Sequence, residues 1–283
     1  MKIVDIRLAL ITTTTVLNRL IGIKLKHLIN IEHVDKNLAV EYIRKYHYSK
    51  IMPRLTKHYL GIVINDSICG IITLGWGTQP LKTIRKIFYK HELLTKDYFE
   101  IGKMCFDPKY NNDKNFGSQA IKAIINWMKY NTNCLFLYTL ADGIMGKCGY
   151  VYQASNFKYL GKFETCVYLD NTTGEKIHPR SSKQLLIENA EFENKDKLYW
   201  LTYEFLEHKN LSKIFGYMFR YIYALNKDAY RILNEYPEYN NVSNPKDSDL
   251  KFYKRIANRK KIEIKQPTFN MNVFNYNYQK VDE

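Results

Sequence analysis

The order of the apolar segments constrains the fold of this chain more than any other feature. A helical pattern of apolar residues runs from Val34 to Tyr46. Two apolar runs follow, Tyr59–Ile64 and Ile68–Leu74, and the short polar link between them predicts a β-hairpin. Phe99–Phe106 is predicted as a third strand. A helix followed by a hairpin and a further strand indicates a sheet that is antiparallel at its start.

The second half of the pattern alternates helices and strands. A polar loop leads through Gly117 into an amphipathic helix, and the almost wholly apolar Cys134–Leu140 is typical of a buried central strand. A short helix within 146–157, a strand at Phe163–Leu169, a helix near 183–190 and a last strand at Met218–Leu225 complete the prediction. This order fits the α/β (α+β) class, with one helix N-terminus facing a ligand loop.

Charge and composition restrict the partners. Lys and Arg number 43 and Asp and Glu 28, which leaves a net charge of +15. Such an excess predicts a polyanionic partner, with nucleic acid ahead of an anionic membrane. Part of the excess reflects a general over-use of Lys, Asn, Ile and Tyr. Hydrophobic residues make up 46% of the chain, which is enough for a sizeable core and excludes wholesale disorder.

Cysteine usage and the N-terminal segment predict the compartment. The five cysteines are an odd number without a Cys-x-x-Cys pair, which argues against a disulfide framework and a cysteine zinc site. The apolar stretch Leu8–Val16 is too short to span a bilayer, and Asp5 and Arg7 are unsuited to a signal peptide. We expect a cytoplasmic protein without a membrane association.

The segment Asn115, Phe116, Gly117 and Ser118 opens a helix directly after a strand and a loop. The unpaired N–H groups of a helix start can cradle a phosphate, although a Gly-Ser start is also an ordinary helix cap. The placement resembles the coenzyme A pyrophosphate loop of GNAT acetyltransferases. The loop lacks the second glycine and the leading Gln or Arg of that pattern. Two alternatives therefore stay open for this segment, binding of acetyl-CoA or another acyl-CoA and an ordinary helix cap.

A more specific resemblance rests on motifs in a shared order. They are Tyr46-His47-Tyr48-Ser49-Lys50 with Pro53, Glu100-Ile101-Gly102-Lys103-Met104-Cys105 with Asp107-Pro108, Ala141-Asp142-Gly143, the run 149–157, His178-Pro179-Arg180-Ser181 and Phe219-Arg220-Tyr221. Together they resemble the phage Mom family, whose GNAT-related members modify adenines in phage DNA against host restriction. The resemblance covers roughly residues 38–226.

The resemblance implies a GNAT-like mixed, mostly antiparallel sheet flanked by helices. It also implies transfer of a small carbamoylmethyl-type group to the N6 amine of adenine, in the cytoplasm of a phage-infected host. A metal, iron, would be held by His47, Tyr48 and Asp142, a mixed N/O donor set suited to such an ion. A His beside a Tyr is also a common packing pair, and Asp-Gly after a strand is also an ordinary turn.

The chemistry of adenine adds an argument of its own. The N6 lone pair is delocalised into the ring, so the attacking amine needs a base that removes a proton as the bond forms. Asp142 is the candidate base, with Tyr48 or Tyr150 as a proton relay. Reaching N6 in a duplex favours flipping the base into a pocket. Candidate stacking walls are Trp76, Tyr150, Tyr152 and Phe157, although core packing is the commoner fate of an aromatic residue.

Several basic or hydroxyl side chains are candidate contacts to double-stranded DNA. They are Arg180, Ser181 and Lys183 in and after the His178 motif, and Lys50 and Arg54 after the first helix. The block Lys251–Lys265 holds seven basic residues against the single acidic Glu263, and would add salt-sensitive affinity without sequence preference. A solvated surface is the alternative interpretation of such a run.

We therefore divide the chain into an N-terminal segment (1–35), a GNAT-like catalytic domain (36–233) with an insertion at about 191–213, and a basic Asn/Lys/Tyr-rich extension (234–283). Three hypotheses remain. The first is a Mom-like DNA-modifying transferase, the second an acyl-CoA-dependent N-acyltransferase of a protein or small-molecule amine, and the third a non-catalytic DNA-binding protein. Altered adenine, acyl-CoA binding without DNA, and salt-sensitive DNA binding without modification would distinguish them.

Overall fold

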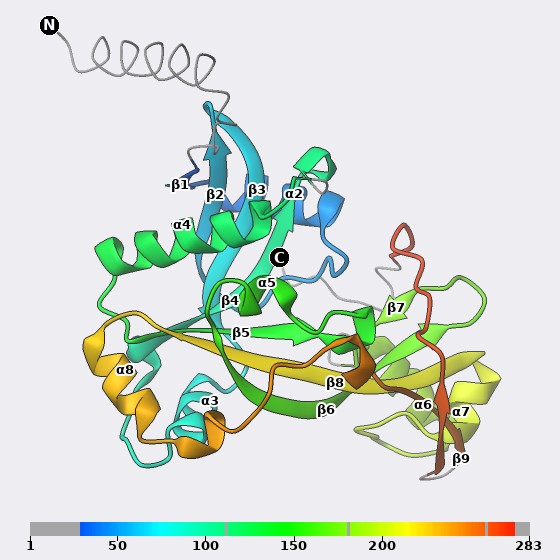
Figure 1. Cartoon of the computed structure of the whole chain (residues 1–283). Helices are drawn as coiled ribbons and strands as arrows, with labels where there is room; N and C mark the ends of the chain where they lie inside the picture. Colours follow the sequence, from blue (N-terminus) through cyan, green and yellow to red (C-terminus); the bar gives the residue numbers. More distant parts are fainter. Residues whose placement is uncertain (1–28, 111–112, 180–181, 258–259, 275–283) are drawn as a thin grey trace, which may run out of the picture.

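A computed structural model describes residues 29–110, 113–179, 182–257 and 260–274 of the chain. A ten-stranded sheet organises them, in the order β1-β2-β3-β4-β5-β8-β6-β7, with β9 paired to β8 and β10 to β9 (Figure 1). β4 and β5 pair in parallel, whereas the other described neighbours pair antiparallel. The predicted fold class, a mixed and mostly antiparallel sheet flanked by helices, is thus confirmed.

The first half of the sheet follows the predicted order with some additions. Its elements are β1 (Asn30–His33), α2 (Lys36–Tyr46), β2 (Leu55–Ile64), β3 (Ser67–Trp76), α3 (Pro80–Ile87), β4 (Tyr98–Phe106), α4 (Phe116–Asn131) and β5 (Phe136–Asp142). Asn65 and Asp66 form the hairpin turn with positive φ angles of 48° and 60°, a conformation that Asn and Asp tolerate better than most residues. The pattern analysis did not predict β1 or α3.

The second half contains α5 (Tyr150–Gln153), β6 (Lys158–Asp170), β7 (Lys176–Ile177), α6 (Lys183–Phe192), α7 (Tyr203–His208), β8 (Leu211–Ala224), α8 (Lys227–Asn234), β9 (Phe252–Ala257) and β10 (Lys260–Ile264). The prediction of Met218–Leu225 as the last strand was wrong in two respects. The strand begins seven residues earlier, because Leu211–Tyr217 pair with β6, and two basic strands follow it. Charged side chains on an edge hairpin hide the period-2 pattern that reveals a half-buried strand.

The helices cover both faces of the sheet. α4 and α5 pack on one face, where Ile121 and Ile124 meet Leu74, Phe99 and Leu137. On the other face α2 covers the β3–β4 end, and α3 and α8 cover the opposite end around Phe136 (Figure 1). On this second face α2 and the α3–α8 pair pack against separate apolar clusters.

β4 and β5 diverge along their length. They are paired only where Tyr98–Ile101 lies beside Phe136–Thr139; beyond these residues β4 continues against β3, and β5 continues against β8 as far as Asp142. Past this point β4 stays paired with β3 and β5 with β8, but β4 and β5 no longer pair with each other. The two strands therefore separate in the middle of the sheet.

α2 is held by a cap at its start and ends directly before two candidate site residues. The Asp35 carboxylate accepts hydrogen bonds from the backbone N–H of Asn37 (2.7 Å) and Leu38 (3.4 Å). We expect Asp35→Ala to lower the free energy of unfolding by about 1 kcal/mol, and the unfolding temperature by about 2–4 °C. Thermal unfolding followed by circular dichroism measures the shift, and an unchanged midpoint would contradict this assignment of the cap.

Among the described residues, we find no helix that combines the length and the apolar character needed to cross a bilayer. The five cysteines are free thiols, and all but Cys166 are buried.

Candidate functional site

A cavity of about 710 Å³ lies where β4 and β5 diverge. Its walls come from the segment after α2, the ends of β3 and β5, the middle of β4 and of β6, the strand β7, and the chain after β10. The polar side chains that line it are His47, Tyr48, Ser49, Lys50, Arg54, Trp76, Thr78, Glu100, Lys103, Asp142, Thr165, Lys176, His178, Lys183 and Asn270. Apolar side chains such as Met52, Leu140 and Phe274 complete the lining, and cations outnumber carboxylates in the walls.

His47 and Tyr48 reach this cavity because α2 ends at Tyr46. His47 caps the helix with an extended backbone (φ −92°, ψ 138°), and its N–H still donates to Ile43 O at 2.8 Å. The two adjacent rings stack with their centres 4.3 Å apart. Neighbouring residues of a helix would point about 100° apart, so it is the end of the helix that lets both rings face one cavity.

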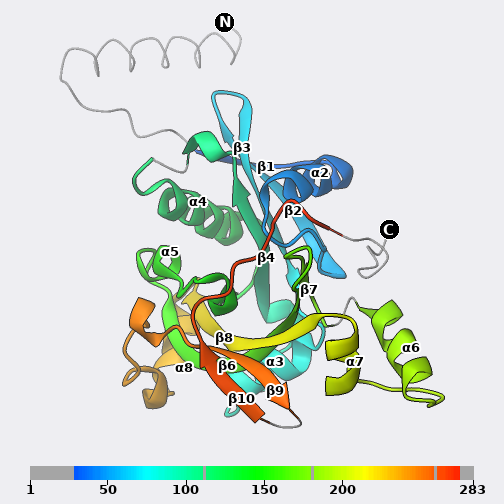
Figure 2. The ribbon, with the colours of Figure 1, turned by 90° about the vertical axis from the view of Figure 1, so that its right-hand side faces the viewer.

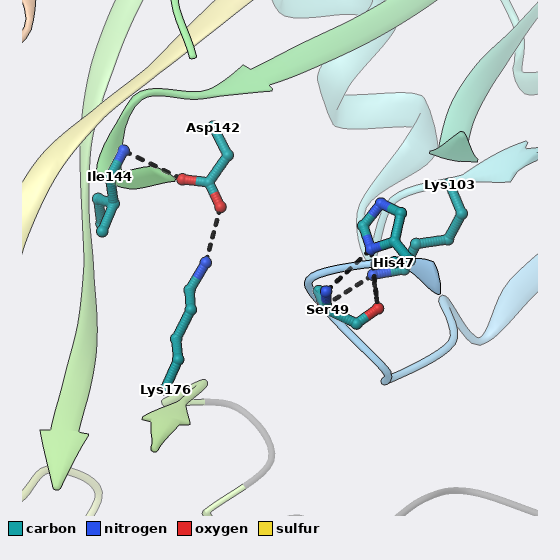
Figure 3. Close-up of polar contacts among 6 residues, drawn as sticks. All are labelled: His47, Ser49, Lys103, Asp142, Ile144 and Lys176. Carbon is teal, nitrogen blue, oxygen red and sulfur yellow. Dashed lines mark hydrogen bonds and ion pairs between the residues drawn. The ribbon is translucent and has the colours of Figure 1, made fainter. Parts of the chain in front are cut away.

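The chemistry of these two rings is set by their surroundings. His47 Nδ1 lies 2.9 Å from the backbone N of Ser49 and 3.0 Å from its carbonyl oxygen (Figure 3). Burial, together with the positive charge of Lys103, lowers the pKa of His47 to about 2, so the imidazole is neutral at physiological pH. Burial raises the pKa of the Tyr48 phenol, and the Asp142 charge adds to this, so the phenol keeps its proton.

Asp142 ends β5 and is held at two points. One carboxylate oxygen accepts from the backbone N–H of Ile144 at 3.1 Å, and the other lies 2.8 Å from Lys176 Nζ (Figure 3). Both side chains are largely buried, with 12% and 11% of their surfaces exposed. Lys176 Nζ also lies 5.1 Å from the centre of the Tyr48 ring, and Lys147 Nζ lies 4.3 Å from it. The Asp142 carboxylate and the Tyr48 ring thus share a largely buried corner of the cavity with lysine ammonium groups.

Lys103 and Glu100 line the same cavity from β4. The Lys103 ammonium donates to Ser49 Oγ (2.8 Å) and Ser49 O (3.1 Å), and only 8% of the residue is exposed. Burial lowers the pKa of Lys103 to about 7, and the nearby charge of Lys176 contributes in the same direction. Burial raises the pKa of Glu100 to about 7, against a hydrogen bond from the Gly77 backbone. Both groups therefore titrate near neutral pH.

The metal set implied by the family resemblance does not fit this arrangement. Ser49 occupies Nδ1 of His47, both Asp142 oxygens already have partners, and the Tyr48 phenol is neutral beside two lysine ammonium groups. In Figure 3 the carboxylate points to Lys176 and the imidazole toward the Ser49 loop. Within the described part of the chain, no three His, Cys, Asp or Glu side chains form a metal-binding group.

The structure separates the other predicted residues into two sets. One set lines the cavity together with His47, Tyr48 and Asp142. It consists of Lys50, Arg54, Lys183 and Trp76. Tyr150 does not line the cavity: it lies on α5, is 52% exposed, and its hydroxyl accepts from the Asp247 N–H at 3.2 Å. The suggested stacking residues Tyr152 and Phe157 are buried in the core. Arg180 and Ser181 lie outside the described residues.

The predicted phosphate loop opens α4 on the face opposite the cavity lining. Asn115 adopts a left-handed conformation (φ 69°), and the Ser118 hydroxyl donates to Asn115 O at 2.9 Å. Phe116 is buried and stacks on Tyr110 with 4.6 Å between ring centres, so it serves the core. None of residues 115–118 lines the cavity. Their predicted role in acyl-CoA binding remains a prediction.

Sequence reasoning missed several residues of the site. Lys103 and Glu100 belong to a motif that carried the resemblance, yet a Lys or Glu within a strand signals exposure unless its burial is known. Lys176 comes from a two-residue strand that pairs only with β6, which is too short for a pattern. Asn270, Met271, Val273 and Phe274 reach the cavity from the distant C-terminal part of the chain, where no local signal marks them.

Comparison with known proteins agrees with the sequence resemblance. Residues 28–246 match the Mom protein family. The "Methylcarbamoylase mom" of Escherichia phage Mu is 26% identical over 158 residues, a match that covers 53% of this chain and 60% of that protein. The chain thus matches less than two thirds of its relative's length.

Solved structures with partial similarity are acetyltransferases. An N-acetyltransferase from Staphylococcus aureus is 14% identical, with a TM-score of 0.36. An acetyltransferase from Bacillus subtilis in complex with CoA is 12% identical, with a TM-score of 0.34. Each comparison covers 70% of this chain and 99% of the other. The family match extends over most of the chain and includes the cavity residues of β2 to β8. The chain belongs to the Mom protein family.

Proposed function

We propose that this protein modifies DNA by transferring a small carbonyl-linked group to the N6 amine of adenine. The observation that carries the proposal is one cavity in which the Asp142 carboxylate, the His47–Tyr48 stack and the lysines 103 and 176 meet, in a chain of the Mom family. The name of the phage Mu relative points to a methylcarbamoyl group as the one transferred, in place of the carbamoylmethyl type that the sequence resemblance implied.

Asp142 is the base that the site offers for this reaction. In the proposed step N6 attacks the carbonyl carbon of the donor, the new N–C bond forms, and the leaving group departs with its electron pair. The N6 proton passes to the carboxylate. His47 and Tyr48 are poor bases by comparison, because the pKa of His47 is lowered to about 2 and the Tyr48 phenol holds its proton.

The cations of the cavity suit the charge that develops in such a reaction. Attack on a carbonyl places negative charge on its oxygen, and pre-positioned donors in a partly dry site stabilise that charge. Lys176 is held by Asp142 and Lys103 by Ser49, so neither ammonium has to reorganise during the reaction. We assign the two lysines to this stabilising role, and the neutral Tyr48 hydroxyl to hydrogen-bond donation.

The cavity also suits a base that leaves the duplex. Its volume of about 710 Å³ falls in the range of sites for small ligands. Trp76 lines it, and its indole N–H donates to Thr95 O (3.0 Å) and Tyr98 O (2.8 Å). These bonds hold the ring rigidly, which favours stacking on a flipped base. Lys50, Arg54 and Lys183 lie in the same lining, where they would contact the flanking phosphates.

The test is to express the protein in a bacterium, digest the host DNA to nucleosides and measure their masses. We expect a mass gain confined to deoxyadenosine, equal to one methylcarbamoyl group less the displaced hydrogen, and its loss in Asp142→Asn. Unmodified DNA from a folded protein supplied with phage-infected cell extract as a source of donor would contradict the proposal. Thermal stabilisation by acetyl-CoA without DNA would favour the acyltransferase alternative.

A further inference from the structure

The hairpin β9–β10 lies outside the part of the chain that matches the Mom family, which ends at residue 246. It nevertheless joins the same sheet, because Lys254 and Tyr253 pair with Ile214 and Phe215 of β8 (Figure 2). β5 occupies the same edge of β8 farther along, where Asp142 pairs with Met218. β9 therefore continues the edge that β5 leaves when it ends at the candidate base.

The hairpin and β8 enclose a hollow of about 220 Å³ whose charged lining is entirely cationic. It is lined by Lys213, Phe215, Arg255, Lys260 and Lys261. The side chains are gathered around one ring: Lys261 Nζ lies 4.5 Å, and Lys213 Nζ 5.3 Å, from the centre of Phe215. Arg255 Nε donates to Ala257 O at 3.2 Å, which holds the guanidinium beside the hollow.

Two carboxylates of the described residues pair with lysines at or beside the hairpin. Glu164 pairs with Lys261 at 2.6 Å, and Glu263 lies 3.9 Å from Lys251 rather than among the lining cations. The residues that line the hollow thus include four basic side chains and no acidic one. Cations brought together in this way repel one another, so the hollow is suited to an anion that spans several of them.

The position of the hollow relative to the cavity indicates which anion. Cys166 lines the cavity and pairs directly with Phe215, so the two sites adjoin at this residue. Along β8, Phe215 of the hollow is three positions from Met218, the residue opposite Asp142, which is about 10 Å at 3.3 Å per residue. That spacing corresponds to about three base-pair steps of DNA.

We propose that the hollow formed by Lys213, Phe215, Arg255, Lys260 and Lys261 binds the phosphate backbone of the duplex whose adenine occupies the cavity. This inference rests on the proposed function, since it places a second contact on the same DNA. The hairpin supplies sequence-neutral affinity and sets the orientation of the duplex, while the cavity selects the base. The basic block of the C-terminal extension acquires a defined structural role in this way.

The test is the salt dependence of DNA binding, measured by fluorescence anisotropy on a labelled 30-base-pair duplex. The variant Lys213→Gln/Lys260→Gln removes two cations and keeps the Lys261–Glu164 pair. We expect the slope of log affinity against log salt to become less negative by about 2, at about 0.9 per lost contact, and the affinity at 0.1 M salt to fall at least tenfold. The matched control is Lys122→Gln/Lys129→Gln on α4, which lies away from the hairpin in both views (Figures 1 and 2).

Each outcome bears on a defined claim. If both double variants keep the wild-type slope while the wild type binds DNA, the hairpin is not a phosphate contact and the inference is wrong. If the control loses as much as the hairpin variant, the effect is general charge and the inference is also wrong. Vesicles containing phosphatidylserine provide a third arm: loss of vesicle binding with unchanged DNA binding would assign the hollow to a membrane surface. Failure of the proposed function is seen separately, as unmodified deoxyadenosine.

Discussion

Replacing Asp142 by Asn is expected to lower the rate of adenine modification at least a hundredfold, because the variant keeps the shape of the side chain and loses the base. General base catalysis contributes about 10²–10⁴-fold to such reactions. DNA affinity should change little, since the phosphate contacts we propose lie elsewhere. The measurement is the fraction of modified deoxyadenosine formed per unit time by the purified proteins, with the anisotropy assay beside it.

A control must separate lost chemistry from lost structure, since Asp142→Asn leaves the largely buried Lys176 without its partner. Removing one member of a buried ion pair costs about 3–5 kcal/mol, whereas replacing both members is close to neutral. The double variant Asp142→Asn/Lys176→Met should therefore be more stable than Asp142→Asn alone and equally inactive. Activity restored in the double variant would show that Asp142 acts through structure and not as the base.

Replacing Glu100 by Gln is expected to raise the free energy of unfolding at pH 8 by an amount on the order of 3 kcal/mol. Burial raises the pKa of this carboxyl from its ordinary value of 4.5 to about 7. Each unit of that difference corresponds to 1.36 kcal/mol of preference for the protonated form in the folded state. The wild-type protein therefore holds an unfavourable buried charge above pH 7, which Gln does not carry.

The sign of the pH dependence follows from proton binding. Between pH 4.5 and about 7 the folded state keeps the Glu100 proton that the unfolded state has lost, so stability falls as pH rises. The difference between variant and wild type should thus be near zero at pH 4, grow through this interval and stay constant above it. Urea unfolding at pH 4, 6 and 8 measures it. A difference independent of pH would contradict the assignment to Glu100 ionisation.

Lys103 affects the same titration in the opposite sense above neutrality. Its pKa is lowered to about 7 in the folded protein, so the folded state releases a proton that the unfolded chain keeps up to pH 10.5. Stability from this group is complete above pH 10.5 and is lost as pH falls toward 7. Because Lys103 is present in both proteins, the comparison of Glu100→Gln with the wild type removes its contribution.

The charges of the cavity residues suit one kind of reaction. His47 is neutral, Tyr48 is protonated, and Asp142 is held beside Lys176. The site thus favours an anionic base and an accumulating negative charge on a substrate, and disfavours a bound cation. Acyl transfer to an amine has these requirements, because a proton leaves the nucleophile while charge grows on the carbonyl oxygen. Cys166, which lines the cavity, pairs with Phe215, which lines the hollow at β8 and β9.

Local patterns in the sequence determined much of this protein. Apolar periodicity identified α2, the hairpin β2–β3, β4, α4 and β5, since each of these elements buries one face or is wholly buried. The ordered motifs identified the family, and with it His47, Tyr48 and Asp142. The resemblance implied those three residues, and the structure places each of them at or just after the end of a helix or strand.

Tertiary structure alone decided which side chains share the cavity and what charge they carry. The pKa values of Glu100, Lys103 and His47 are shifted mainly by burial. The residues that bury them come from segments far apart in the chain. Tertiary structure also decided that Tyr150 lies outside the cavity and that the hairpin β9–β10 pairs with the edge of β8. Sequence patterns record the local fit of a residue to its own helix or strand, whereas strand pairing and burial depend on contacts between distant residues.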